Sequence, residues 1–299
     1  MQSVLILGAT GQVGIEVTKA FQSEKTWRVL TPKSNTLDLT NLDLISYVNQ
    51  AKTGPFGLDI IVNCAAYTNV NGAEDEDTGS DTNIQMNATL PSTLGVISKQ
   101  HDIPVIHLST DYVFQGDASE RGYTENMKTN PLNEYGRVKL MGETALTNIS
   151  KRHYIIRTSW IYSENRNNFV KHWFNNADSE LNGADVVMDQ IGRPTSAIEL
   201  AEVILKMAYD TGENYGIYHY GGSDVMSWAE FAETIFKKMN SNRKVNHIAS
   251  DLWYSPAVRP KNNNLNIDKI KETFNLKPLS TNLYLTEVIR RLQTDNEKV

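Results

Sequence analysis

A glycine-rich turn between an apolar run and a helical pattern is the feature that most constrains how this chain folds. The turn reads Gly8-Ala9-Thr10-Gly11-Gln12-Val13-Gly14 and directly follows the apolar residues 4–7. Apolar side chains then recur at helical spacing, which predicts a helix over residues 11–22. A strand, a Gly-x-x-Gly-x-x-Gly turn and a helix in this order are typical of the first unit of a parallel sheet that binds a dinucleotide. A glycine-rich turn without a ligand is the alternative.

The rest of the first half continues this alternation. Further strands are expected at residues 27–31, 59–63, 104–108 and 154–157, and helices at residues 41–51, 92–100 and 135–149. The alternation predicts an α/β fold, a Rossmann-type doubly wound parallel sheet with helices on both faces. After residue 157 the pattern loosens, although Ser227 and Glu230 have the spacing of a capping box. We expect an NAD(P)-binding Rossmann domain over residues 1–157. Residues 158–299 should form mainly a smaller C-terminal α/β substrate lobe that returns some elements to the sheet.

Composition narrows the class of partners. The chain has 299 residues, of which 40% are hydrophobic and 21% charged, as in ordinary globular proteins. The net charge of −6 argues against a nucleic-acid partner, because there is no basic excess to neutralise phosphates. No apolar stretch approaches the ~20 residues that span a bilayer, so we expect no membrane partner and a cytoplasmic location. Cys64 is the single cysteine, which excludes an intrachain disulfide.

Three glycines and the ends of two further strands are the candidate cofactor contacts. Gly8 allows the tight turn, Gly11 lets the backbone approach a pyrophosphate, and Gly14 lets the helix pack closely on the sheet. The amino end of the following helix carries a partial positive charge that favours phosphate. Asp38 is a candidate for the adenine side, or alternatively a helix N-terminal charge. The small residues of Asn63-Cys64-Ala65-Ala66-Tyr67-Thr68 suit a cofactor that lies across a strand end.

The end of the second expected strand bears on which cofactor is used. It reads Leu30-Thr31-Pro32-Lys33-Ser34 and contains no acidic residue. An acidic residue at this place usually holds the ribose 2′-hydroxyl of NAD, whereas Lys33 and Ser34 suit a 2′-phosphate. The sequence therefore predicts a preference for NADPH, with NADH as the alternative cofactor.

A tyrosine and a lysine four residues apart are the candidate chemical groups. Tyr135 and Lys139 lie on one face of the expected helix, and Thr110 follows the strand expected at residues 104–108. Because an ammonium group favours a phenolate, we expect Lys139 to lower the tyrosine pKa from about 10. Tyr135 would then donate a proton to a carbonyl oxygen as hydride reaches its carbon. Thr110 would hydrogen-bond the same oxygen. A surface helix pair is the alternative for Tyr135 and Lys139.

Further motifs extend this pattern along the chain. They are Asp38-Leu39-Thr40, Ser109-Thr110-Asp111-Tyr112-Val113-Phe114, Tyr135-Gly136-Arg137-Val138-Lys139, Arg157-Thr158-Ser159-Trp160, Asp189-Gln190-Ile191-Gly192-Arg193-Pro194-Thr195 and Arg259-Pro260-Lys261-Asn262. With these motifs the chain resembles the extended short-chain dehydrogenase/reductases and, within them, the dTDP-4-dehydrorhamnose reductase family. The resemblance covers nearly the whole length.

The resemblance implies a reduction of the C4 keto group of dTDP-4-dehydro-L-rhamnose by NAD(P)H. Tyr135 would be the proton donor, assisted by Lys139 and Thr110. The cofactor contacts it implies are Gly8, Gly11, Gln12, Val13, Gly14, Asp38, Leu39, Ala65, Ala66, Tyr67, Thr68, Tyr135 and Lys139. The sugar contacts it implies are Thr110, Asp111 and Trp160, whose indole alternatively belongs to the core. Where the family pattern has a serine after Arg-Pro-x-Asn, this chain has Asn263.

The resemblance also leaves three questions open. Some members dimerise through a magnesium ion held by carboxylates, for which Glu16 and Glu199 lie in corresponding segments. Ordinary exposed helix carboxylates are the alternative reading of this pair. The substrate could instead be another nucleotide-linked deoxysugar. A non-catalytic NADP-binding subunit, like the regulatory subunit of methionine adenosyltransferase, is the alternative of another class.

Overall fold

A parallel β-sheet forms the centre of the computed structural model, which describes residues 1–32, 37–39, 43–75, 79–177, 183–210, 212 and 214–296. In this part of the chain the sheet has six strands in the order β10-β5-β4-β3-β1-β2, and every pairing is parallel. The strands are β1 (Gln2–Leu7), β2 (Trp27–Leu30), β3 (Ile60–Asn63), β4 (Val105–Thr110), β5 (His153–Thr158) and β10 (Gly216–His219). This is the doubly wound α/β sheet expected from the alternation of strands and helices.

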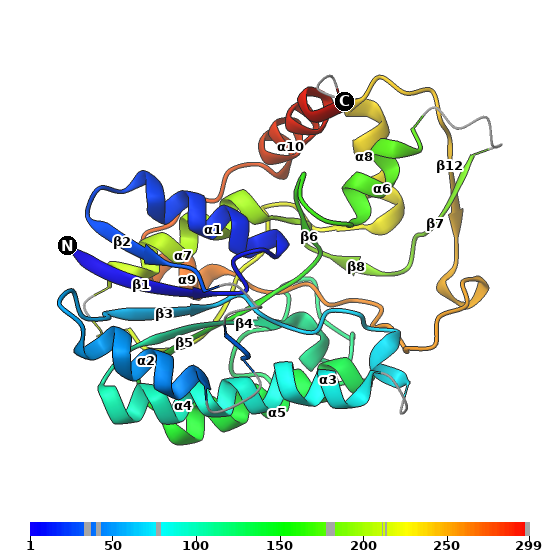
Figure 1. Ribbon diagram of the computed structural model, residues 1–299. Helices are drawn as coiled ribbons and strands as arrows, with labels where there is room; N and C mark the ends of the chain where they lie inside the picture. Colours follow the sequence, from blue (N-terminus) through cyan, green and yellow to red (C-terminus); the bar gives the residue numbers. More distant parts are fainter. Residues whose placement is uncertain are drawn as a thin grey trace.

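Helices cover both faces of this sheet (Figure 1). On one face lie α1 (Gln12–Ser23), α7 (Ala197–Ala208) and α9 (Asp268–Thr273). On the other face lie α2 (Asp43–Thr53), α4 (Leu90–His101) and α5 (Glu134–Ile149). Two apolar clusters, one on each side of the strands, hold these layers together. Burial of apolar side chains on both faces explains why the strands read as almost continuous hydrophobic runs.

The later part of the chain contributes to two places. Strand β10 and helices α7 and α9 return to the main sheet. A separate apolar cluster joins α6 (Phe169–Asn175), β7 (Ala184–Val187), α8 (Trp228–Lys238) and α10 (Thr281–Asn296). Strand β12 (Val245–Ile248) pairs with β7 beside this cluster. Figure 1 shows these elements gathered at one end of the sheet, beyond the carboxyl ends of its strands. We call them the C-terminal lobe; the boundary at residue 157 stays a prediction.

Short elements complete the chain. They are η1 (Gly72–Glu74), α3 (Ser80–Ile84), the π-helical η2 (Gln85–Thr89), η3 (Asp111–Val113), β6 (Ile161–Tyr162), β8 (Ile191–Gly192), β9 (Thr195–Ser196), β11 (Met226–Ser227) and η4 (Ser250–Leu252). None of the helices within the described ranges is both long and apolar enough to cross a membrane.

The strand order reverses between β1 and β3. From β1 the chain passes to β2 on one side, and it then returns to β3 on the other side. In open α/β sheets, the carboxyl ends of the strands at such a reversal flank the crevice where ligands bind. The glycine turn follows β1 at this point, so the fold places it at the expected binding position.

Candidate active site

The glycine turn is built as a cradle for phosphate. Gly8 adopts a φ of 74°, and a Cβ there would come within 2.6 Å of the Ala65 backbone nitrogen. The amide of Gly11 donates to the carbonyl of Gly8 at 2.9 Å, which closes the turn. A Cβ at Gly11 would meet only that carbonyl within 4 Å, so its outer side is open. Helix α1 begins at Gln12 without a side-chain cap, so its first amides are available to an anion. These features fit the pyrophosphate of a dinucleotide.

The other expected cofactor residues gather at the same edge of the sheet. Ala65, Ala66, Tyr67 and Thr68 follow β3, the neighbour of β1. The side chain of Asn87 holds this segment, because it accepts from the Tyr67 amide at 3.2 Å and donates to the Tyr67 carbonyl at 2.8 Å.

Asp38 and Leu39 come after β2, with Asp38 exposed and Leu39 half-buried. Gln12 and Val13 open α1, and Gln12 donates to the Ile161 carbonyl at 3.3 Å. Lys33 and Ser34 lie outside the described residues.

The candidate chemical groups come from the carboxyl end of β4 and the first turns of α5. Strand β4 extends to Thr110, two residues beyond the expected end, because it pairs with β5 up to Thr158. Asn133 caps α5 by accepting from the Gly136 amide at 2.8 Å, so the helix starts just before Tyr135. The Thr110 hydroxyl acts on the phenol of Tyr135, because it lowers the pKa of that tyrosine. The structure thus brings Tyr135 together with Thr110 and with Asp111, the residue that follows Thr110 in the sequence.

Lys139 lies one helical turn beyond Tyr135 and is only 2% exposed. Its ammonium group donates to the carbonyl of Leu108 at 2.6 Å. Burial lowers the pKa of Lys139 to about 8, and the charge of Glu143 opposes this shift. Because the ammonium group is directed to the backbone of β4, it is held beside the site in a fixed position.

The expected effect of Lys139 on the tyrosine is wrong for this arrangement. Burial raises the pKa of Tyr135, and the negative charge of Asp111 raises it further. The hydrogen bond from Thr110 acts in the opposite direction without overcoming them. The ammonium group of Lys139 donates to the Leu108 carbonyl, and the loss of water around the phenol sets the direction of the Tyr135 pKa shift. Tyr135 is therefore held in its protonated form, which is the form that donates.

Asp111 is a buried carboxylate at the centre of the site, with 2% of its surface exposed. It accepts from the Thr110 hydroxyl at 3.1 Å and from the side-chain amide of Asn263 at 3.2 Å. Burial raises its pKa to about 7, against the hydrogen bonds from Asn263 and Thr110 that lower it. The contact with Asn263 was not predicted, and the place where the chain departs from the Arg-Pro-x-Asn-Ser pattern was its only signal.

A buried ion pair joins the elements next to the candidate chemical groups. Arg157 of β5 donates to Glu143 of α5 at 2.7 Å, and both side chains are almost fully buried. Glu143 also accepts from the Ser109 hydroxyl at 2.5 Å. This pair fixes α5 against β4 and β5, the elements that carry Lys139 and Thr110. Sequence reasoning missed Glu143, although its place four residues after Lys139 was a visible signal.

The Trp160 indole is packed against other residues, so it is not a free surface for a sugar ring. It has a φ of 49°, a conformation that is rare for a bulky residue. Its indole stacks on Trp228 with ring centroids 3.6 Å apart. The backbone of Gly192 lies so close to the indole that a Cβ there would come within 2.7 Å. Trp160 is half-buried by these contacts, and its role toward a sugar stays a prediction.

An aromatic cavity of about 260 Å³ lies next to this tryptophan pair. Phe169, Trp228 and Trp253 form part of its wall, and Arg259 lies at the same cavity. The guanidinium of Arg259 also donates to the Tyr112 hydroxyl at 3.2 Å, and the Tyr112 ring lies edge-on to Tyr135. Arg259 therefore lies at the cavity and also contacts Tyr112, the neighbour of Tyr135.

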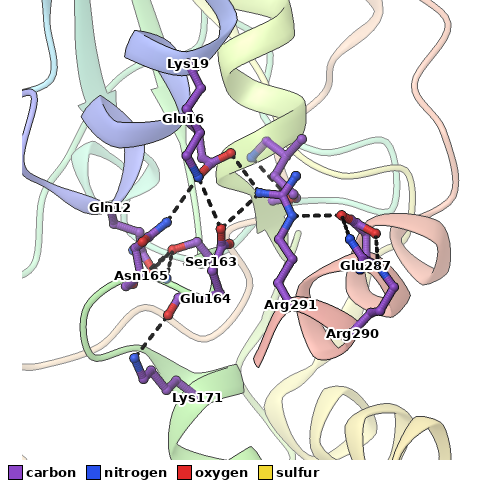
Figure 2. A network of polar contacts seen from close by, with 12 residues as sticks. Gln12, Glu16, Lys19, Ser163, Glu164, Asn165, Lys171, Glu287, Arg290 and Arg291 are labelled. Carbon is purple, nitrogen blue, oxygen red and sulfur yellow. Dashed lines mark hydrogen bonds and ion pairs between the residues drawn. The ribbon is translucent and has the colours of Figure 1, made fainter. Parts of the chain in front are cut away.

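Glu16 and Glu199, which family members' magnesium-linked dimers brought into consideration, are buried, at 4% and 3%, and are not the exposed helix carboxylates of the alternative. Glu16 is paired with cations, because it accepts from Lys19 at 2.6 Å and from Arg291 at 3.1 Å (Figure 2). Burial raises the pKa of Glu199 to about 7. The described ranges contain no group of three or more acidic, histidine or cysteine side chains that could hold a metal ion. Nothing in these residues supports the magnesium ion, and the homodimer stays a prediction.

Known proteins resemble the chain along nearly its full length. Residues 1–294 match the sequence model of the family described as RmlD substrate binding domain. A dTDP-4-dehydrorhamnose reductase of Aggregatibacter actinomycetemcomitans is 35% identical over 289 residues, which cover 93% of this chain and 95% of that protein.

Two solved structures have the same fold. A dTDP-4-dehydrorhamnose reductase of Clostridium acetobutylicum superposes with a TM-score of 0.89 at 33% identity, covering 98% of this chain and 100% of the other. The enzyme of that name from Bacillus anthracis, solved in complex with NADP, has a TM-score of 0.86 at 31% identity, covering 97% and 99%. The chain therefore belongs to the RmlD substrate binding domain family, the family of the dTDP-4-dehydrorhamnose reductases.

Proposed function

We propose that this protein is an NADPH-dependent reductase that converts dTDP-4-dehydro-L-rhamnose to dTDP-L-rhamnose. The observation that carries the proposal is the meeting of Thr110, Tyr135 and Lys139 at the end of β4, on the edge of the sheet that also presents the glycine turn. Relatives with this reductase name cover the chain almost completely. A bound reduced nicotinamide supplies the hydride for such a reaction.

Tyr135 is the proposed proton donor to the C4 oxygen. Its raised pKa keeps the proton on the phenol until negative charge develops on that oxygen. The Thr110 hydroxyl would orient the same oxygen, and Lys139, whose ammonium group is held at the end of β4, would hold the nicotinamide ribose of a bound cofactor. Thr110 and Asp111 are the proposed contacts to the sugar, together with the edge of Trp160.

The aromatic cavity is the proposed place for the nucleotide part of the substrate. Its tryptophan and phenylalanine walls suit a flat base, and the guanidinium of Arg259 suits a phosphate. Arg259 and Tyr112 lie between the cavity and Tyr135. The sugar of a nucleotide bound in the cavity would therefore extend toward Tyr135.

NADPH rather than NADH is the proposed cofactor. The end of β2 offers no acidic residue for a ribose 2′-hydroxyl, and a relative was solved with NADP. Comparing kcat/KM for the two cofactors tests this choice, and a clear preference for NADH contradicts it.

The experiment for the proposed function follows the loss of NADPH absorbance with dTDP-4-dehydro-L-rhamnose made in situ. Nuclear magnetic resonance then identifies the sugar that is formed. We expect turnover to dTDP-L-rhamnose. Turnover to the other C4 epimer contradicts the proposed product. NADPH binding without any consumption contradicts the activity itself and favours a binding subunit.

A further inference from the structure

Arg166, in the loop between β6 and α6, has a backbone conformation that is rare for its residue type. Its φ is 59°, in the left-handed region that favours glycine. A residue other than glycine is strained there, and it persists only where the surrounding structure fixes it. Because such strain is concentrated at functional sites and ligand clamps, the conformation of Arg166 indicates a role beyond connecting two elements.

Hydrogen bonds of the loop hold Arg166 in this conformation. The side-chain amide of Asn168 donates to the carbonyl of Ser163 at 2.7 Å and to the carbonyl of Arg166 at 3.4 Å. The side-chain oxygen of Asn168 caps α6. Asn165 donates from its side chain to Glu16 of α1 at 3.2 Å (Figure 2). The loop is therefore fixed both to its own helix and to the helix that follows the glycine turn.

The guanidinium of Arg166 lies on the glycine turn. It donates to the carbonyl of Thr10 from Nε at 2.9 Å and from Nη2 at 2.8 Å. Thr10 directly precedes Gly11, and α1 begins one residue later, at Gln12, without a side-chain cap. The Thr10 carbonyl carries a partial negative charge beside amides that suit an anion, and the guanidinium offsets this charge. The two hydrogen bonds therefore place a positive charge next to the proposed position of the cofactor phosphates.

This guanidinium keeps donors for a further partner. Arginine has five N–H groups, and the Thr10 carbonyl takes two of them. Among the described residues, no aspartate or glutamate forms an ion pair with Arg166. Arg291, by contrast, is paired with Glu16 and Glu164. Because the Arg166 side chain is exposed, an incoming ligand can reach its remaining N–H groups, which match the oxygens of a phosphate.

We propose that Arg166 binds a phosphate group of the dinucleotide cofactor at the glycine turn. The proposal rests on the proposed cofactor of this site. The amides of the turn and of the first residues of α1 hold the phosphate from one side. The guanidinium holds it from the other side, from the loop before α6. Arg166 thus adds a contact to the cofactor from a segment more than 150 positions away from the glycine turn, and this contact offsets the strain of its backbone.

Two kinds of phosphate in the cofactor have the required chemistry, and two cofactors separate them. NADPH has a pyrophosphate and a ribose 2′-phosphate, whereas NADH has the pyrophosphate alone. We expect the pyrophosphate, because Thr10 adjoins Gly11 and the start of α1. Loss of the guanidinium should then weaken both cofactors by the same factor. Weakening of NADPH alone supports the contact and assigns it to the 2′-phosphate.

The first variant is Arg166→Met, which removes the guanidinium and keeps an unbranched side chain. Fluorescence titration without a sugar substrate measures the dissociation constants of NADPH and NADH. Each should rise by about 10-fold, the lower end of what a hydrogen bond to a charged group contributes, because the site is exposed. Unchanged dissociation constants for both cofactors overturn the proposal.

A matched pair of variants separates phosphate binding from support of the turn. Arg166→Lys keeps the positive charge, whereas Arg166→Gln keeps a neutral N–H donor for the Thr10 carbonyl. The lysine variant should bind both cofactors more tightly than the glutamine variant, which should resemble Arg166→Met. Wild-type affinity in Arg166→Gln would mean that Arg166 only holds the loop against the turn, and it overturns the proposal.

Arg243→Gln is the control for the loss of an arginine that donates to backbone carbonyls. The guanidinium of Arg243 donates to the carbonyls of Asn176 and Gly183 in the C-terminal lobe. Its cofactor dissociation constants should equal those of the wild type. Equal weakening in Arg243→Gln and Arg166→Gln overturns the assignment, because the effect would then not depend on the glycine turn.

Arg166→Gly tests the strain. Glycine adopts a positive φ readily, so without cofactor this variant should unfold at a higher urea concentration than Arg166→Met. Its affinity for NADPH should be as low as that of Arg166→Met, since neither variant carries the charge. Equal urea midpoints contradict the strain on which the argument begins, and wild-type affinity in Arg166→Gly overturns the proposal.

These titrations use no sugar, so they are separate from the proposed reduction. Failure of the wild-type protein to oxidise NADPH with the proposed sugar overturns the proposed function. The titrations then still decide whether Arg166 binds the cofactor. Failure of the wild-type protein to bind either cofactor overturns both proposals.

Discussion

At the scale of single residues, the site depends on how water is excluded from three oxygen-bearing side chains. These side chains belong to Tyr135, Thr110 and Asp111. Burial raises the pKa of the Tyr135 phenol and of the Asp111 carboxyl. Desolvation outweighs the hydrogen bonds that oppose it, because a lost hydration shell costs an ionised group more than one neutral partner returns. The tyrosine therefore keeps its proton for the reaction, whereas the sequence led us to expect a lowered pKa for this proton donor.

Replacing Tyr135 by phenylalanine tests the donor directly. We expect kcat to fall by about 10²–10⁴-fold, because the variant has no phenol proton to give. The dissociation constant of NADPH should change little, since the glycine turn is untouched. Steady-state kinetics and fluorescence titration measure the two quantities. Near-normal turnover in this variant removes Tyr135 from its proposed role.

At the scale of elements, the helix that follows the glycine turn is tied to the last helix of the chain. Arg291 of α10 donates to Glu16 of α1 at 3.1 Å and to Glu164 at 2.9 Å (Figure 2). Lys19 contacts the same two carboxylates. The segment after Glu164 reaches the turn itself, since the Arg166 guanidinium donates to the Thr10 carbonyl at 2.9 and 2.8 Å. Helix α10 is thus tied to α1 by polar contacts, and the segment that precedes α6 contacts the glycine turn.

Two neighbouring arginines of α10 allow a controlled test of this tie. In the described part of the chain, Arg291→Met leaves the buried carboxylates of Glu16 and Glu164 with Lys19 as their remaining cation, so the free energy of unfolding should fall by about 3 kcal/mol. Arg290→Met is the control, because Arg290 is 61% exposed and pairs only with Glu287 in the described part of the chain. That exposed pair should contribute less than about 1 kcal/mol. Urea unfolding measures both variants, and equal losses contradict the importance of the tie.

At the scale of the whole molecule, the sheet and the C-terminal lobe act as one unit in our interpretation. Strand β10 lies in the main sheet, while the cluster of α6, α8 and α10 lies beyond the carboxyl ends of the strands. Asn263 connects the late part of the chain to Asp111 in the candidate active site. Arg291 connects it to Glu16 of α1, the helix that follows the glycine turn. A ligand bound at the turn should therefore stabilise both parts.

Calorimetry with and without NADPH tests this coupling. At about 100 times its dissociation constant, the cofactor should raise the unfolding free energy by about 2.7 kcal/mol. We expect a single transition that moves to higher temperature as a whole. Two separate transitions, of which only one responds to NADPH, contradict the coupling and support independent folding of the two parts.

Local patterns determined much of this protein in advance. The strands and helices of the first half lie within a few residues of their expected positions, because they follow from hydrophobic periodicity and turn residues. The capping box of Ser227 and Glu230 is present with both of its hydrogen bonds. The glycine turn after β1 and the Tyr-x-x-x-Lys spacing on α5 were equally visible, since each depends on residues close in sequence.

Only the tertiary structure decided which distant residues meet. Asn263 reaches Asp111 across 152 positions, and Arg291 reaches Glu16 across 275. It also decided the sign of the pKa shift of Tyr135, which depends on burial and on the negative charge of Asp111. Periodicity and spacing describe neighbours along the chain, whereas desolvation and ion pairing depend on all the groups that folding brings to one point.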